Sequence, residues 1–130
     1  MSLITVLVTG AGGGVGQGII KSLRMIQDLE IKIIAADMSE FAVGLYAGDI
    51  ACLVEGCSSP TYMNSLARIF DKYNVDFYIP GTDVELMFCA ENKIKMKQDF
   101  DVETVISSIE TINIANDKFK SCKSGHKSGH

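Results

Sequence analysis

Hydrophobic and polar positions along the chain fall into two repeating patterns. Short apolar runs, rich in β-branched residues, predict buried strands, and they alternate with longer segments in which apolar residues recur at helical spacing. This alternation is typical of a parallel sheet covered by helices on both faces. The expected strands are residues 4–9, 31–36, 51–54, 76–79 and 104–107.

Three of the intervening segments predict amphipathic helices. The second should begin at Ser59-Pro60, and the third at a capping box running from Thr82 to Glu85. A short turn or helix near residues 41–47 and a last helix capped by Asn116 complete the expected elements. The expected buried positions are Val15, Ile19, Ile20, Leu23 and Ile26 in the first helix, Met63, Leu66, Ala67, Phe70 and Tyr73 in the second, and Met87, Ala90 and Ile94 in the third.

This order of elements predicts the fold class. Right-handed crossovers give an α/β, doubly wound, Rossmann-like fold with a mainly parallel five-stranded sheet in the order 3-2-1-4-5. Such folds bind ligands at the carboxyl ends of the strands, where the strand order reverses. We therefore expect the functional site between the ends of the first and fourth strands.

The end of the first strand carries the strongest candidate site, with five glycines within residues 10–16. Glycines allow the backbone to approach a ligand closely, and the start of the following helix offers free N–H groups. With only one or two glycines, a tight strand-to-helix connection that binds no ligand would be the favoured interpretation. The pattern predicts a phosphate or carboxylate site formed by Gly10, Ala11, Gly12, Gly13, Gly14, Val15 and Gly16.

Acidic and hydroxyl side chains follow two other strands that end at the same edge. Asp37 ends the second strand, where it could hold a ribose hydroxyl or be an ordinary polar strand end. Thr82 and Glu85 follow the fourth strand, and helix capping is the favoured interpretation for both. Asp83 has no such structural role and is the better functional candidate.

The spacing of the glycines is also compatible with the binding of a dinucleotide. The common Gly-x-Gly-x-x-Gly pattern fails because Val15 stands where a glycine is needed, but Thr9, Gly10, Gly13 and Gly16 fit the fingerprint of extended short-chain dehydrogenases. Those enzymes also need Tyr-x-x-x-Lys, and none of the four tyrosines has a lysine four residues on. An NAD(P)-binding module therefore remains an alternative.

Composition narrows the class of protein. The chain has 130 residues, 47% of them hydrophobic, and a formal charge of −4, which argues against a nucleic-acid partner. No apolar run has the length of a membrane span, and the strand at the N-terminus leaves no room for a signal sequence. The four cysteines lack metal-ligand spacing, so we expect reduced thiols, no metal site and a cytoplasmic location.

Four segments in order resemble ATP-grasp ligases related to the carbamoyl-phosphate synthase large subunit. They are LVTGAGGGVGQGIIKSL at residues 7–23, Asp37-Met38 with the turn at residues 44–49, VDFYIPGTDVEL at residues 75–86, and IANDKF at residues 114–119. The resemblance covers residues 4–121. It implies a pre-ATP-grasp domain, with residues 122–130 as a flexible tail that cloning could have added.

The resemblance also implies a function. Intact members use ATP and magnesium, held by two further lobes, to activate a carboxylate as an acyl phosphate that an amine then attacks. Lys118 matches a position that reaches the ATP phosphates. We expect this chain to hold no cofactor and to be inactive alone, with the lobes as partners. A non-catalytic interaction domain is a further alternative, and exposed apolar residues predict a weak homodimer through Ile112, Ile114 and Phe119.

Overall fold

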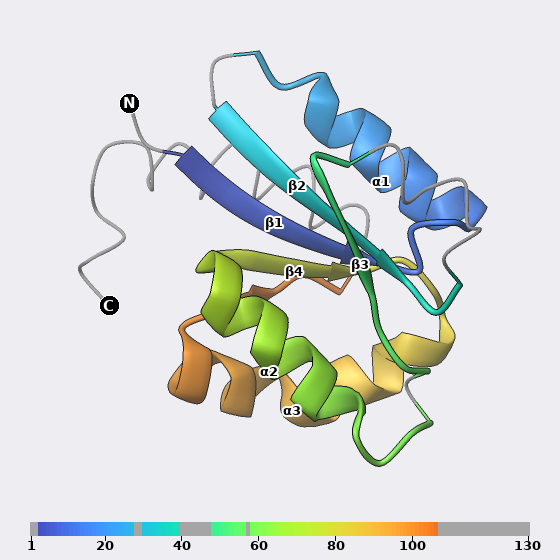
Figure 1. Cartoon of the computed structure of the whole chain (residues 1–130), viewed down its shortest axis with the longest axis vertical. Coiled ribbons are helices and arrows are strands. Elements are labelled where there is room, and N and C mark those ends of the chain that lie inside the picture. The colour runs from blue at the N-terminus through green and yellow to red at the C-terminus, as the bar shows by residue number, and fades with distance from the viewer. Residues whose placement is uncertain (1–2, 28–29, 40–47, 57, 107–130) are drawn as a thin grey trace.

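The computed structural model describes residues 3–27, 30–39, 48–56 and 58–106, which form a single sheet flanked by three helices (Figure 1). The expected turn at residues 41–47, the helix capped by Asn116, Lys118 and the apolar residues expected in a dimer lie outside the described residues. The elements are β1 (Leu3–Thr9), α1 (Gly14–Arg24), β2 (Glu30–Asp37), β3 (Ile50–Leu53), α2 (Tyr62–Tyr73), β4 (Phe77–Pro80), α3 (Val84–Phe100) and β5 (Glu103–Thr104).

All strand pairs of the sheet are parallel, in the order β3-β2-β1-β4-β5. The central strand β1 pairs with β2 on one side, where Leu7 lies opposite Ile34, and with β4 on the other, where Leu7 lies opposite Tyr78. The predicted α/β doubly wound fold and its strand order are confirmed. The strand order therefore reverses between β1 and β4, as expected.

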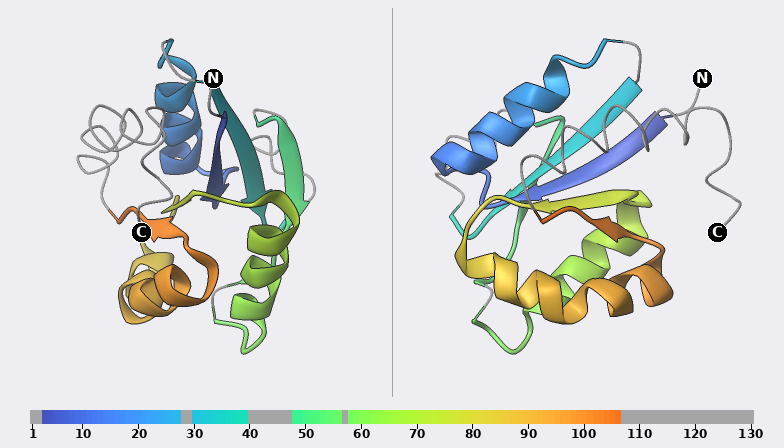
Figure 2. Two further views of the ribbon diagram at one scale, coloured as in Figure 1. Left: turned by 90° about the vertical axis from the view of Figure 1, so that its left-hand side faces the viewer. Right: turned by 180° about the vertical axis from the view of Figure 1, so that it is seen from behind.

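Helices cover both faces of the sheet (Figure 2). Alternate side chains of β1 enter two separate cores, because neighbouring residues of a strand point to opposite faces. Val6 and Val8 pack with Ile20 of α1, whereas Leu7 packs with α2 and α3. Within the described segments, no helix combines the length and the apolar character that crossing a bilayer requires.

The predicted buried face of the third helix is wrong. In α3, Met87 and Ile94 are 73% and 71% exposed, and Ala90 is exposed as well. The buried residues are instead Glu85, Cys89 and Met96. The helix is rotated because the carboxylate of Glu85 points inward, toward hydroxyl groups of the sheet and of α2.

The other helices differ from prediction at their first turns. Val15 is 60% exposed, while Ile19, Ile20 and Leu23 are buried as expected. The second helix starts at Tyr62, after an N-cap at Thr61 that makes no side-chain capping bond, so it begins later than Ser59-Pro60 suggests. The strand boundaries agree with the predictions to within a few residues.

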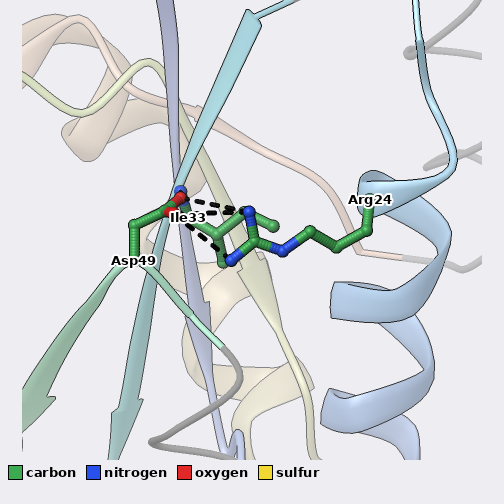
Figure 3. Close-up of polar contacts among 3 residues, drawn as sticks. All are labelled: Arg24, Ile33 and Asp49. Carbon is green, nitrogen blue, oxygen red and sulfur yellow. Dashed lines mark hydrogen bonds and ion pairs between the residues drawn. The ribbon is translucent and has the colours of Figure 1, made fainter.

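A polar contact joins α1 to the segment that precedes β3 (Figure 3). The carboxylate of Asp49 accepts a hydrogen bond of 2.8 Å from the backbone N–H of Ile33 and pairs with the guanidinium of Arg24 at 3.3 Å. The backbone N–H of Asp49 in turn donates to the carbonyl of Ile33 at 2.8 Å. The segment that leads into β3 is thereby fixed against β2, opposite the last turn of α1.

Candidate functional site

A cavity of about 140 Å³ lies at the carboxyl edge of the sheet, where the strand order reverses. The ends of β1 and β2, the segment after β3, the first residue of α2 and the turn between β4 and α3 all contribute to its wall. The cavity therefore occupies the predicted place. Its lining residues are Thr9, Gly10, Gly13, Asp37, Met38, Val54, Glu55, Gly56, Tyr62, Thr82, Val84 and Glu85.

Glu85 is the centre of a buried cluster of hydroxyl groups beside the cavity. Glu85 is only 5% exposed. Its Oε2 accepts hydrogen bonds from Thr9 Oγ1, from the Tyr62 hydroxyl at 2.6 Å and from the Tyr78 hydroxyl at 3.1 Å. Thr82 Oγ1 donates to Oε1 at 2.7 Å. Four donors from β1, α2, β4 and the β4–α3 turn thus hold one carboxylate that has no basic partner in the cluster.

The two tyrosines of this cluster stay protonated over the whole physiological range. Burial raises the pKa of Tyr62 well above its usual value, and the negative charge of Glu85 raises it further. Burial likewise raises the pKa of Tyr78. Both phenols therefore serve Glu85 as fixed donors and do not act as bases.

The capping-box interpretation of Thr82 and Glu85 is wrong. Asp83 is the N-cap residue of α3, with an αR backbone and no side-chain capping bond. The carboxylate of Glu85 bonds instead to four side-chain hydroxyls, those of Thr9, Tyr62, Tyr78 and Thr82. Asp83, the preferred functional candidate, is exposed and is not among the residues that line the cavity.

The glycine-rich loop is held by its own hydrogen bonds. The N–H of Gly12 donates to Asp37 Oδ2 at 2.8 Å, the N–H of Ala11 to the carbonyl of Ala36, and the N–H of Gly13 to the carbonyl of Gly10. The first bond within α1 runs from Gln17 to Gly13, so the helix itself does not use the N–H groups of residues 14–16. Three of the loop donors that an anion would need are thus already occupied.

Asp37 is equally occupied by backbone groups. Besides Gly12, its carboxylate accepts from the N–H of Met38 at 2.7 Å and from the N–H of Ser39 at 3.3 Å. The aspartate thus ties the end of β2 to the glycine loop across the edge of the sheet. This is a structural role, and it places one negative charge in the wall of the cavity.

Three glycines make the loop possible, and only two of them belong to the glycine run. Gly10 has a φ of +60°, and a Cβ on Gly16 would lie 2.3 Å from the carbonyl oxygen of Gly10. A Cβ on Gly81 would lie 2.2 Å from the carbonyl oxygen of Thr9. The start of α1 and the end of β4 therefore meet at the end of β1 with no room for side chains.

The middle of the loop has no such restriction. Gly13 has a φ of −84°, and a Cβ there would make only an ordinary contact of 3.5 Å. A Cβ on Gly14 would meet no atom within 4 Å. The fold itself therefore does not require glycine at these two positions.

Glu55 adds a third carboxylate to the rim. It follows β3 and accepts hydrogen bonds from the hydroxyls of Ser59, at 2.6 Å, and Thr61. These bonds lower the pKa of Glu55, since they stabilise its charged form. Glu55 therefore fixes the approach to α2 and keeps its negative charge at neutral pH.

The structure brings together five of the predicted site residues in the cavity wall and leaves the others outside it. Ala11 is fully buried in the core, and Gly12 contributes through its bond to Asp37. The sequence analysis missed Tyr62, whose place at the first turn of α2 gives no motif, and Glu55, whose position after a short strand could have been noted. The predicted residues in the wall are Gly10, Gly13, Asp37, Thr82 and Glu85, and those outside it are Ala11, Gly12, Gly14, Val15, Gly16 and Asp83.

Fold and site together define a Rossmann-like domain with a small cavity at its switch point, mostly apolar and bordered by carboxylates. Within the residues that the structure describes, no group of three or more His, Cys, Asp or Glu side chains is arranged to hold a metal ion. Residues 6–106 match the sequence model described as "PylC-like, N-terminal domain", and the chain belongs to that family. The domain of this family is the pre-ATP-grasp domain of ATP-grasp ligases. No curated protein matches the chain significantly.

Proposed function

We propose that this domain forms one wall of the substrate cleft of an ATP-dependent carboxylate–amine ligase, similar to the carbamoyl-phosphate synthase large subunit. Membership of the pre-ATP-grasp family supports the ligase. The cavity at the carboxyl edge of the sheet, with Glu85 and Asp37 in its wall, is the observation that carries the substrate role.

In this proposal the nucleotide binds elsewhere. A cavity of about 140 Å³ is smaller than the usual range of pockets for drug-sized ligands, and a nucleotide is of that size. ATP and magnesium would be held by the ATP-grasp lobes, with Lys118 at the phosphates, and the isolated chain would be inactive. The same function is consistent with a cytoplasmic protein, where ATP is available and the thiols of Cys52 and Cys89 stay free.

The division of labour can be tested by measuring magnesium-dependent ADP release. The chain alone should release no ADP, whereas the domain joined to the ATP-grasp lobes of a ligase should release it when the acid and amine substrates are present. Gly13→Val should then raise the KM for one substrate, because a side chain there fills the cavity without straining the loop. Gly14→Val is the matched control, since that position lies outside the cavity wall.

Two results would contradict this function. Turnover by the chain alone would place the catalytic groups within it. An unchanged KM in Gly13→Val, for every substrate, would remove the cavity from the cleft.

A further inference from the structure

The charges around the cavity allow a more specific assignment of its ligand. We propose that the cavity holds the amine substrate as its ammonium ion before the reaction, the proton passing to solvent before the nitrogen attacks, and this inference rests on the proposed ligase function. It differs from the phosphate or carboxylate ligand that the glycine run suggests. Three observations support it: the sign of the charges, the state of the donors and the apolar part of the wall.

The charged residues of the wall that the structure describes are all acidic. Asp37 comes from the end of β2, Glu55 from the segment after β3 and Glu85 from the first turn of α3, so three separate elements each supply a carboxylate. No lysine, arginine or histidine is among the described residues that line the cavity. A concave, partly buried wall strengthens such a field, because the protein screens charge less than water does.

The N–H groups of the loop residues at the cavity are engaged, whereas those of residues 14–16, which the helix leaves unused, belong to residues outside the cavity wall. The N–H groups of Ala11, Gly12 and Gly13 bond to the protein itself, and Gly12 already has the carboxylate of Asp37 as its anion. The hydroxyls of Thr9, Tyr62 and Tyr78 all donate to Glu85 Oε2. An incoming anion would have to displace a carboxylate, whereas an ammonium group adds to the existing bonds.

The acceptors, in contrast, have capacity left. Oε1 of Glu85 accepts one hydrogen bond, from Thr82, and a carboxylate oxygen has two lone-pair positions. An ammonium group has three donors and no acceptor, which suits a wall of this kind.

An organic ammonium fits better than a metal cation. Among the described residues, no three or more His, Cys, Asp or Glu side chains are close enough together to hold a metal ion. Met38, Val54 and Val84 supply apolar surface in the same wall, which suits the methylene groups next to an amine. A primary alkylamine is therefore the simplest probe of the site.

The test is a titration of the ¹⁵N-labelled chain at pH 7 and constant ionic strength. The probes are n-butylamine, butyrate, inorganic phosphate and the uncharged n-butanol. We expect saturable shifts of the amide signals of Gly10, Gly13 and Thr82 with butylamine and none with the other three compounds. Butylamine binding should also weaken as added salt screens the field.

Two substitutions identify the carboxylates responsible. Glu85→Gln removes a charge and keeps the shape, and it should weaken butylamine binding about ten-fold or more. Glu55→Gln should weaken it by a smaller factor, since Glu55 is exposed. Glu91→Gln is the matched control on α3, because Glu91 is exposed and lies outside the cavity wall, and it should leave the affinity unchanged.

The outcomes separate this inference from the proposed function. Saturable binding of butyrate or phosphate at these amides, or no binding of butylamine, would overturn the ammonium site, while ADP release would still decide the ligase role. Should Glu85→Gln fail to fold, Glu55→Gln decides, because an exposed rim residue can be exchanged without affecting the core. An unchanged affinity in Glu55→Gln and in any folded Glu85→Gln would also overturn the inference.

Discussion

The hydroxyl of Tyr62 lies 2.6 Å from Oε2 of Glu85, so the first residue of α2 is joined to the first turn of α3 through one carboxylate. The two helices cover the same face of the sheet, and both begin at the cavity. The bond therefore fixes the distance between two parts of the cavity wall. It also couples the stability of the fold to the charge on Glu85.

Replacing Tyr62 by phenylalanine tests that coupling at neutral pH. Tyr62→Phe removes one charge-assisted hydrogen bond and should lower the free energy of unfolding by about 1–3 kcal/mol. Urea denaturation at pH 7 measures the change. Tyr73→Phe is the matched control, because Tyr73 is only half-buried and its hydroxyl does not bond to Glu85.

The same variant should change the response to alkali. A tyrosine in the unfolded chain loses its proton near pH 10, whereas the raised pKa of Tyr62 keeps the folded form protonated at that pH. Stability from this group is complete below pH 10 and falls as the pH rises further, because only the unfolded state releases a proton. Tyr62→Phe should therefore lose less stability between pH 9 and pH 11 than the wild type. Equal losses would show that Tyr62 ionises normally.

The glycines should divide into two groups when each is replaced by alanine. Gly16→Ala and Gly81→Ala place a Cβ against backbone oxygen atoms and should each lower the free energy of unfolding by about 3 kcal/mol. Gly14→Ala should be close to neutral, and Gly18→Ala, inside α1, should stabilise by roughly 0.5–1 kcal/mol. Denaturant midpoints measure all four. A large loss in Gly14→Ala would contradict the loop geometry.

Asp49 should matter more to stability than Arg24. The ion pair is exposed, and such pairs contribute at most about 1 kcal/mol, so Arg24→Ala should have a small effect. Asp49→Ala also leaves the N–H of Ile33 without its acceptor, and it should lower the free energy of unfolding by about 1 kcal/mol more. Thermal denaturation of both variants compares them. Equal melting temperatures would mean that the bond to Ile33 contributes nothing.

NADH should bind weakly at best. The carboxylate of Asp37, which a dinucleotide would need for its ribose, already accepts three backbone N–H groups. We expect a dissociation constant no tighter than about 1 mM, corresponding to roughly −4 kcal/mol, in a calorimetric titration. A micromolar constant would instead favour the NAD(P)-binding module.

The sequence analysis predicted the fold well because the fold depends on apolar runs. The central strands β1, β2 and β4 are largely apolar and buried, and the helices between them fix the parallel order. The rotation of α3 could not be predicted this way. Met87 and Ile94 are apolar and Glu85 is charged, so periodicity alone places them on the wrong sides. The hydroxyls that make it favourable to bury the glutamate include those of Thr9 and Tyr62, which lie 76 and 23 residues away in the sequence.

The place of the cavity could be predicted, whereas the hydrogen bonds that occupy its donors could not, for a related reason. The edge of the sheet follows from topology, and Gly10, Asp37 and Glu85 were found because they follow strands. Whether the cavity favours an anion or a cation depends on which of its N–H and hydroxyl donors are already bonded within the protein. The bond from Gly12 to Asp37 is formed only when β1 and β2 lie side by side.

The packing of Gly10, Gly16 and Gly81 divides what looks like one glycine motif into two parts with different evolutionary freedom. The three packed positions admit no side chain, so any descendant of this domain that keeps the fold must keep them. Gly13 and Gly14 have room for a side chain, and Gly13 lines the cavity. A new side chain at Gly13 alters which substrates the cavity accepts while the scaffold remains intact. The loop thus offers a natural place for substrate preference to diverge among relatives.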